Sequence, residues 1–448
     1  MLEIRHHMNE PEFKLLASAE ALEAALAAHN AGDLDLAEKL YAWLAESHPA
    51  NAEVLHHRGV LMHQRGHREA AIDLLQDSLK LDAQRPDWHN DLGNMLAERQ
   101  RLEPARDAFM ASIELDVNQP VVWNNLGAVL QRQELFDEAE YSYRQAMALN
   151  PDFFDAMSNL GHLLSLRGKV GESAEYLCRA FVAAATDATP RDLLGIAYSM
   201  LGRLDDAKEV YRNWLEEKPG HPIASHLHAA CSGIDVPARA SNAYIEMHFD
   251  DLAKGFDAKL VENLDYQAPP LIARMLEQFV PPVRALAGLD AGCGTGLCGI
   301  HLSPYVERLT GIDLSANMLT LARQKGIYDE LVKIELTQFM LEHPGAFDLV
   351  VIADTLIYFG PLETVFAAAR TVLRPGGRLI FTAETPLATA DPYCIKPNGR
   401  YGHGREYLDS TMQAAGFHDR VVEPTVIRIE LGRPVDGFIV TARRPGPG

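Results

Sequence analysis

The chain has 448 residues, too many for one ordinary hydrophobic core, so two or more domains are expected. Hydrophobic residues make up 47% of the chain and charged residues 23%, which is the balance of a folded globular protein rather than a disordered one. The formal net charge of −21 gives no electrostatic reason to bind the phosphates of nucleic acid or an anionic membrane surface. We therefore expect neither nucleic acid nor a membrane among the partners.

The five cysteines show neither a paired framework nor the spacing of metal ligands. This usage suits a reducing compartment and predicts no metal site. Residues 1–14 are charged and lack the apolar stretch of a secretory signal, and no run approaches the ~18 apolar residues of a membrane span. A cytoplasmic location is therefore expected.

An internal repeat of 34 residues runs through the first half of the chain. Three columns recur at this step: glycine (Gly59, Gly93, Gly127, Gly161, Gly195), a small residue (Ala37, Ala71, Ala105, Ala139, Ser173, Ala207) and a large apolar residue (Tyr41, Leu75, Phe109, Tyr143, Leu177, Tyr211). The period indicates a helical hairpin repeated six times. The glycine of each first helix lets the second helix approach closely.

The most regular copy has Trp-Asn-Asn-Leu-Gly at 123–127, followed by Ala139 and Tyr143. It resembles the tetratricopeptide repeat, and the resemblance covers about residues 18–221. This implies an all-α superhelix whose first helices line a concave groove, with a peptide or protein as the usual partner. Asn125 and Asn159 resemble the asparagine ladders by which some arrays hold a peptide backbone; a solvated helix face is the alternative.

Residues 222–240 are interpreted as a capping helix and a linker. From residue 241 to 448 the pattern changes to strands that alternate with helices, which predicts a parallel sheet. A glycine loop, Gly-Cys-Gly-Thr-Gly at 292–296, follows the first of these strands. Its backbone amides are able to approach a ligand closely. Asp313 ends the second strand, where a carboxylate can accept both hydroxyls of a ribose.

The segment Asp-Ala-Gly-Cys-Gly-Thr-Gly at 290–296 resembles motif I of class I S-adenosylmethionine-dependent methyltransferases. The strands expected at 347–354 and 378–383, and a terminal hairpin at 425–430 and 437–442, follow in the order of that family. The resemblance implies a Rossmann-like, seven-stranded domain over residues 241–448, and a fold class of α followed by α/β. This half is also similar to the Williams–Beuren-region methyltransferase-like proteins, and the fusion resembles predicted bacterial methyltransferases that carry tetratricopeptide repeats.

The resemblance implies S-adenosylmethionine as the cofactor. The residues expected to contact it are Asp290, Gly292, Cys293, Gly294, Gly296, Asp313, Leu314, Met318, Glu335, Leu336 and Asp354. The glycines would hold the methionine portion, Asp290 the ammonium group and Asp313 the ribose. Glu335 is a looser match for the contact to the adenine edge, and a solvated strand end is the alternative.

Residues 241–267 precede the first strand and resemble a leading helical segment that folds over the cofactor. Tyr244, Phe249 and Phe256 would then shield the sulfonium from water. An ordinary amphipathic helix packed on the sheet explains the same aromatic residues equally well.

The acceptor pocket is expected around the ends of the fourth and fifth strands. The expected catalytic residues are His403, Asp354 and Tyr401, and the expected substrate contacts beside the asparagines of the repeats are Tyr358, Glu384 and Arg400. Asp354 follows the fourth strand, at the edge where open α/β sheets bind ligands. His403 lies in a polar, glycine-flanked segment and would act as a general base near neutral pH; an exposed loop histidine is the alternative.

Three functions remain open at this point. The first is a methyltransferase whose repeats capture a peptide or protein and present it to the C-terminal site. The second is a small-molecule methyltransferase whose repeats serve docking or assembly. The third is a binding scaffold with a vestigial cofactor domain, against which the intact glycine loop and Asp313 argue. The acceptor atom and the oligomeric state are not predicted.

Overall fold

The computed structural model describes residues 18–252, 265–281, 284–388 and 391–446. The chain forms two compact units, residues 1–168 and residues 169–448. Across the described residues, no helix is both long and apolar enough to cross a bilayer.

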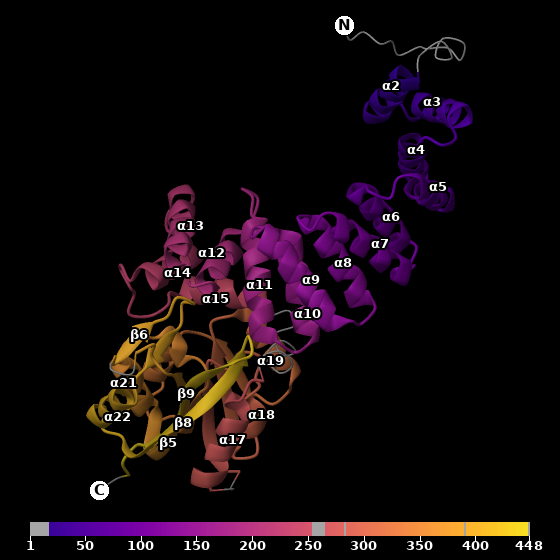
Figure 1. The fold of residues 1–448 in the computed structure, drawn as a ribbon. Coiled ribbons are helices and arrows are strands. Elements are labelled where there is room, and N and C mark those ends of the chain that lie inside the picture. Colours follow the sequence, from indigo (N-terminus) through magenta and orange to yellow (C-terminus); the bar gives the residue numbers. More distant parts are fainter. Residues whose placement is uncertain (1–17, 253–264, 282–283, 389–390, 447–448) are drawn as a thin grey trace. The chain divides into compact units, whose positions relative to one another are not determined.

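The first unit consists of helices in successive hairpins (Figure 1). They are α2 (Ser18–Asn30), α3 (Leu34–Ser47), α4 (Ala52–Gln64), α5 (Arg68–Leu81), α6 (Pro86–Glu98), α7 (Leu102–Leu115), α8 (Pro120–Arg132), α9 (Phe136–Leu149) and α10 (Phe154–Leu166). Gly32 and Gly66 make tight turns inside the hairpins with φ of +80° and +84°, a region that costs glycine little. Helix starts are stabilised at Asp33 and Asn51, whose side chains accept hydrogen bonds from backbone amides.

The glycine and large apolar columns of the repeat contact each other. A Cβ atom at Gly93 would lie 2.6 Å from the ring of Phe109, and one at Gly127 would lie 2.7 Å from the ring of Tyr143. Both large residues are buried. The period of 34 residues therefore records one packing contact, in which a large side chain of the second helix fills the space that glycine leaves on the first.

The second unit begins with four more helices of the same kind. They are α11 (Val170–Ala183), α12 (Arg191–Met200), α13 (Leu204–Glu217) and α14 (Pro222–Ser232). α14 packs on α13 through Leu227 and Cys231, which share a buried cluster with Ala207 and Tyr211. Gly233 ends α14 in the left-handed region with φ of +68°.

A nine-stranded sheet follows, flanked by the remaining helices. The strands are β1 (Leu286–Ala291), β2 (Val306–Asp313), β3 (Glu330–Lys333), β4 (Phe347–Ile352), β5 (Leu373–Glu384), β6 (Tyr393–Ile395), β7 (Tyr401–His403), β8 (His418–Glu430) and β9 (Arg433–Arg443). The helices are α15 (Asn242–Leu252), α17 (Ala268–Phe279), α18 (Gly299–Leu302), α19 (Ala316–Gln324), α20 (Leu336–Glu342), α21 (Glu363–Val372) and α22 (Arg405–Ala414), with a short 3₁₀ turn, η2 (Leu356–Tyr358).

The strand order is β3-β2-β1-β4-β5-β7-β6, and the antiparallel β9 pairs with β5 and β8. Alternate residues of β4 enter two cores. Leu349 and Val351 pack with Ile272 of α17, whereas Val350 and Ile352 pack in the cluster that includes α20, α21 and α22. The central strand is therefore buried on both faces, as a continuous apolar run predicts for a parallel sheet.

The predicted Rossmann-like arrangement is confirmed, with two corrections. β6 and β7 are two short strands between β5 and α22 that were not predicted. The terminal hairpin is also longer than predicted, because β9 pairs with β5 from Arg378 to Glu384 and β8 extends back to His418. Strands of three residues are too short to show a periodicity of two in the sequence.

Candidate cofactor and acceptor site

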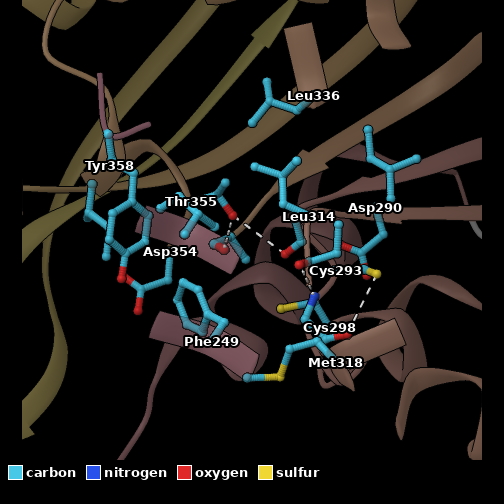
Figure 2. A pocket seen from close by; sticks show the side chains of 18 of the residues that line it. Phe249, Asp290, Cys293, Cys298, Leu314, Met318, Leu336, Asp354, Thr355 and Tyr358 are labelled. Atoms are coloured by element: carbon cyan, nitrogen blue, oxygen red, sulfur yellow. Dashed lines mark hydrogen bonds between the residues drawn. The ribbon is translucent and has the colours of Figure 1, made fainter. Parts of the chain in front are cut away.

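A cavity of about 280 Å³ lies at the carboxyl ends of β1, β2 and β4 (Figure 2). The strand order reverses between β1 and β4, and ligands of open α/β sheets bind at such a switch point. Of the residues expected to contact a cofactor, the cavity is lined by Asp290, Gly292, Cys293, Gly294, Asp313, Leu314, Met318, Glu335, Leu336 and Asp354. The fold therefore brings residues from separate strands together in one cavity.

The glycine loop has left-handed backbone at its glycines. Gly292 has φ of +80°, and a Cβ there would lie 2.2 Å from Thr355 Oγ1. Gly294 has φ of +54°, and its amide donates to Asp313 Oδ2 at 2.9 Å. The missing side chain at Gly292 lets the loop pass close to Thr355 after β4, and the Gly294 amide ties the loop to the end of β2.

The Asp313 carboxylate faces the backbone amides of Gly294, Leu314 and Ser315 at the end of β2. Besides the bond from Gly294, its Oδ1 accepts from the Ser315 amide at 2.8 Å. Burial raises the pKa of this carboxyl, and the amide donors oppose that rise. A carboxylate has about four lone-pair positions, so acceptor capacity remains for a ligand.

Asp290 is a buried carboxyl on β1, only 1% exposed. Its Oδ2 accepts a hydrogen bond of 2.7 Å from the Tyr328 hydroxyl. Burial raises the pKa of Asp290 to about 7; the nearby Asp313 adds to the rise and the bond from Tyr328 opposes it. Asp290 therefore titrates close to neutral pH.

The side of the cavity beyond Asp313 is apolar except for Glu335. Leu314, Met318 and Leu336 line it. Glu335 caps α20, since its Oε2 accepts from the Gln338 amide at 2.9 Å. Its Oε1 is buried without a hydrogen-bond partner within the protein.

Helix α15 is fastened over this site. The Asp250 carboxylate accepts from the Ser315 hydroxyl, and the Asn317 side chain donates to the Asp250 carbonyl at 3.2 Å. Phe249 lines the cavity and meets Tyr358 edge to face, with ring centroids 5.6 Å apart. Tyr244 is buried beside them, and Phe256 lies outside the described residues.

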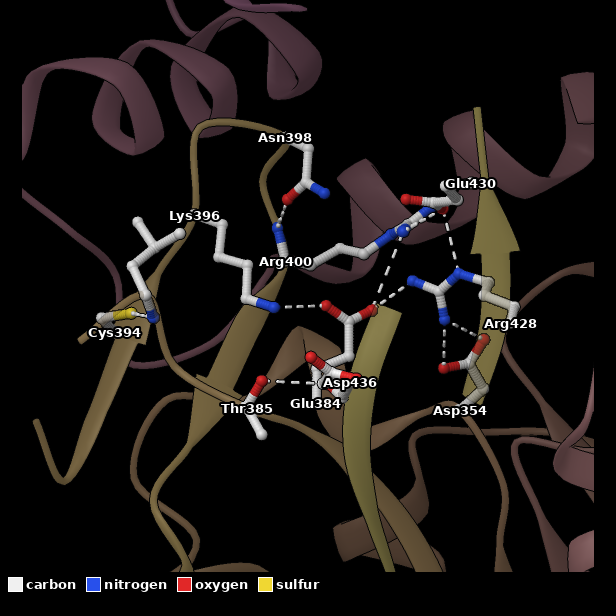
Figure 3. A network of polar contacts seen from close by, with 11 residues as sticks. Asp354, Glu384, Thr385, Cys394, Lys396, Asn398, Arg400, Arg428, Glu430 and Asp436 are labelled. Atoms are coloured by element: carbon white, nitrogen blue, oxygen red, sulfur yellow. Dashed lines mark hydrogen bonds and ion pairs between the residues drawn. The ribbon is translucent and has the colours of Figure 1, made fainter. Parts of the chain in front are cut away.

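Six charged side chains form a network beside the cavity (Figure 3). They are Asp354, Glu384, Lys396, Arg400, Arg428 and Glu430. The Arg428 side chain is 2% exposed and donates to Asp354 Oδ1 at 3.0 Å, to Glu430 Oε1 at 2.9 Å and to Glu384. Lys396 Nζ donates to Glu384 Oε2 at 2.7 Å. Each buried charge therefore has a partner of opposite sign, as burial requires.

Asp354, Arg400, Arg428 and Tyr358 line the cavity, but Glu384 does not. Burial alone would raise the pKa of Glu384, yet the surrounding cations lower it to about 2. Glu384 is therefore ionised and holds Arg428, and its expected contact with the substrate stays a prediction. Asp354 has φ of +49°, an uncommon value away from glycine, and its amide donates to Thr382 Oγ1 at 2.7 Å.

The catalytic role expected for His403 and Tyr401 also stays a prediction. Neither lines the cavity. His403 is fully buried, and its Nε2 bonds to the carbonyls of Phe359 and Gly360 at 2.9 Å. Burial lowers the pKa of His403 to about 4. The Tyr401 hydroxyl donates to the Pro237 carbonyl. Through these hydrogen bonds, both side chains hold backbone segments in place.

Gly296 does not line the cavity either, although the motif predicts a cofactor contact there. A Cβ at Gly296 would lie 2.9 Å from the Tyr328 ring. The glycine thus makes room for a side chain of the protein rather than for a ligand.

The repeat helices α14 and α11 support the turns that carry this network. His226 of α14 bonds through Nε2 to the Gly399 carbonyl at 2.7 Å, beside Arg400. A Cβ at Gly171 of α11 would lie 3.0 Å from the Leu431 carbonyl oxygen, next to Glu430. Both contacts lie inside the second unit.

Asn125 and Asn159 lie in the first unit and bond to asparagines of the preceding repeat. Asn125 Nδ2 donates to Asn94 Oδ1 at 3.0 Å and to Asn90 Oδ1 at 3.3 Å, and Asn159 Nδ2 donates to Asn124 Oδ1 at 3.0 Å. These side-chain amides connect successive first helices.

Sequence reasoning missed Arg428, Tyr328 and Asp250. Arg428 comes from the second-last strand, 74 residues after Asp354, and Tyr328 lies 38 residues after Asp290. Neither belongs to a local motif. The one signal in the sequence is the position of Arg428, a charged residue between two isoleucines in an expected strand. No group of three or more His, Cys, Asp or Glu side chains in the described part of the chain could hold a metal ion.

Comparison with protein families agrees with these two halves. The model of the methyltransferase domain matches residues 289–381. Tetratricopeptide-repeat models match residues 22–86 and 64–120, and the middle TPR-like domain of cilia and flagella-associated protein 70 matches residues 114–217.

Curated relatives resemble parts of the second half. The ubiquinone biosynthesis O-methyltransferase of Pseudoalteromonas translucida is 29% identical over 111 residues, which is 24% of this chain and 47% of the relative. The enzyme of that name from Chromobacterium violaceum is 30% identical, over 35% of this chain and 66% of the relative. Phosphoethanolamine N-methyltransferase of Triticum aestivum is 29% identical, over 30% of this chain and 28% of the relative. The chain spans about half the length of the first of these relatives.

Among solved structures, MamA is 23% identical with a TM-score of 0.35, over 36% of this chain and 93% of that one. An S-adenosylmethionine-dependent methyltransferase of Methanosarcina mazei is 16% identical with a TM-score of 0.32, over 39% of this chain and 98% of that one. The family matches carry the assignment: the chain contains tetratricopeptide repeats followed by a methyltransferase domain. S-adenosylmethionine is the methyl donor that such a domain implies.

Proposed function

We propose that the chain is an S-adenosylmethionine-dependent methyltransferase whose cofactor binds in the cavity over β1, β2 and β4. The observation that carries the proposal is the convergence, in one cavity, of glycine-loop backbone and the carboxylates of Asp290, Asp313 and Glu335. An amino-acid tail, a ribose and an adenine each require one of these groups. A cavity that side chains leave open also argues against a vestigial domain.

The residues fit the charged end of the cofactor. Asp290 would accept from the ammonium group, and the backbone at Gly292 and Gly294 comes close without a Cβ. Asp313 would accept from the ribose hydroxyls with the oxygen lone pairs that its amide donors leave free.

The opposite end fits a flat base. Leu314, Met318 and Leu336 supply apolar walls. The unpartnered Oε1 of Glu335 would accept from an exocyclic amino group, which would remove the cost of leaving this oxygen buried and unpaired.

The cofactor supplies an electrophilic methyl group, so the protein has mainly to position the acceptor and exclude water. Phe249 and Tyr358 would cover the reacting centre from one side. Asp354, held by Arg428, is placed to contact the cofactor or the acceptor. Arg400 and Tyr358 would contact the acceptor, and a base is needed only if the acceptor arrives protonated.

For the acceptor, we propose a peptide or protein captured by the repeats. Tetratricopeptide arrays generally bind such partners in the groove of their first helices. The Oδ1 atoms of Asn125 and Asn159 are acceptors that the hydrogen bonds between repeats leave unused, because both side chains donate through Nδ2. The relatives named for ubiquinone biosynthesis and phosphoethanolamine favour the second candidate, a small-molecule acceptor.

Radiolabelled methyl donor in host extract separates these candidates. Label on protein, lost on deletion of residues 1–168, supports capture by the repeats. Label on small molecules, unchanged by that deletion, supports the second candidate. No transfer by a chain that also fails to bind the donor would contradict the proposed function.

A further inference from the structure

One aromatic ring, that of Tyr328, fills the space left by three glycines. A Cβ at Gly296 would lie 2.9 Å from Cε2 of this ring, and one at Gly311 would lie 2.8 Å from Cε1. A Cβ at Gly299 would lie 2.3 Å from the hydroxyl oxygen. The glycine loop, β2 and α18 therefore all approach the same side chain.

Two of these glycines have no backbone reason to be glycine. Gly299 begins α18 and Gly311 lies inside β2, and neither has a positive φ that would require glycine. Glycine inside a strand costs about 0.5–1 kcal/mol relative to alanine. Space for Tyr328 accounts for Gly299, and space for Tyr328 and Leu331 accounts for Gly311.

Hydrogen bonds of the next residue, Asp329, hold Tyr328 in place. The Asp329 carboxylate accepts from the Leu309 amide at 2.7 Å, and the Asp329 amide donates to the Leu309 carbonyl at 2.9 Å. The ring is thereby fixed beside β2, and its hydroxyl reaches Asp290 Oδ2 at 2.7 Å. Asp290 lines the cavity, whereas Tyr328 stands behind it.

Resting on the proposed binding of S-adenosylmethionine, we propose that Tyr328 is a positioning residue of the cofactor site, which holds the Asp290 carboxylate ready for the ammonium group of the ligand. It acts through Asp290 and touches no ligand itself. Nothing in the glycine motif points to it.

The titratable groups that face Asp290 determine in which direction its pKa changes when the Tyr328 hydroxyl is removed. They are Tyr328, Asp313, Cys293, Cys298 and Tyr266. Burial raises the pKa values of both thiols and of both phenols, so these groups are neutral near pH 7. Asp313 raises the pKa of Asp290, and the Tyr328 hydroxyl lowers it. Loss of the hydroxyl therefore raises the pKa of Asp290 above about 7 and keeps the carboxyl protonated to higher pH.

The test is the dissociation constant for S-adenosylmethionine, measured by calorimetry from pH 6 to pH 9 for the full chain and for Tyr328→Phe. The ratio of the two constants removes the ligand's own titration and that of Asp313. We expect a ratio near 1 at pH 9, rising about tenfold for each unit by which the pKa of Asp290 moves, as the pH falls to 6. A purely structural weakening would give the same ratio at every pH and would overturn the proposal.

Two controls separate the causes. Tyr305→Phe removes a hydroxyl from a half-buried ring of the same core cluster that does not line the cavity, and its ratio should stay near 1. In an Asp290→Asn chain, Tyr328→Phe should have no further effect; an equal effect in that background would show that Tyr328 does not act through Asp290. A wild-type chain that binds no donor at any pH would contradict the proposed function instead.

Discussion

At the scale of single residues, Asp313 is the most direct test of the cofactor site. Asp313→Ala should weaken S-adenosylmethionine binding about 10- to 100-fold, because hydrogen bonds to a charged group contribute roughly 1.5–3 kcal/mol each. Calorimetry of the full chain measures this. Unchanged affinity would remove Asp313 from the ribose role.

Asp348→Ala is the matched control for that change. Asp348 lies at the start of β4, where its Oδ2 accepts from the Ala287 amide at 2.9 Å and from Arg374. It does not line the cavity. Stability should fall, while the dissociation constant of the folded chain should not change.

His403 gives a prediction for stability against pH. Burial lowers its pKa to about 4, from an ordinary value of 6.5. Between these values the unfolded chain binds a proton that the folded chain does not, so His403 makes stability fall as the pH falls. A His403→Gln chain keeps a donor for the carbonyls of Phe359 and Gly360 but cannot titrate.

Urea unfolding at pH 7 and pH 5 compares the two chains. The wild type should lose about 2 kcal/mol more than His403→Gln over this interval, at roughly 1.4 kcal/mol per unit below pH 6.5. Parallel losses in the two chains would show that His403 is protonated in the folded state.

At the scale of elements, the glycine column tests the packing of the repeats. Gly127→Ala should destabilise the first unit by about 1–3 kcal/mol, because the new Cβ would lie 2.7 Å from the Tyr143 ring and overpacking outweighs the better helix propensity of alanine. Ala128→Gly in the same helix should cost about 1 kcal/mol through propensity alone. Urea unfolding followed by circular dichroism measures both, and a stabilised Gly127→Ala chain would refute the contact.

How far the sequence predicts this molecule depends on how local the signal is. The glycine loop, Asp313 and the repeat columns were predictable because each is a short motif or a fixed period. Arg428 and Tyr328 were not, since each gains its role from a partner 74 or 38 residues away in the chain. The burial of His403 was not predictable, because a polar segment between glycines is typical of a loop, whereas pairing of β6 with β7 buries this residue.

At the scale of the whole molecule, the boundary between the two units predicts where the chain can be truncated without loss of the cofactor site. α11–α14 belong to the second unit, and α14 and α11 support the turns beside Arg400 and Glu430. Removal of residues 1–168 should therefore leave donor affinity and thermal stability unchanged. Removal of residues 1–221 should lower stability, because it strips Tyr211 from the buried face of α14. Thermal unfolding with and without the donor compares the two truncations, and equal behaviour would contradict the role of these helices.

In the proposed function, the crevice between β1 and β4 holds the methyl donor. A crystal structure of the full chain grown with S-adenosylhomocysteine would show whether it does. The amino-acid tail should lie beside Gly292 and Gly294, the ribose on Asp313 and the base between Leu314 and Leu336. A crevice that stays empty at saturating ligand, or a ligand bound elsewhere, would contradict it.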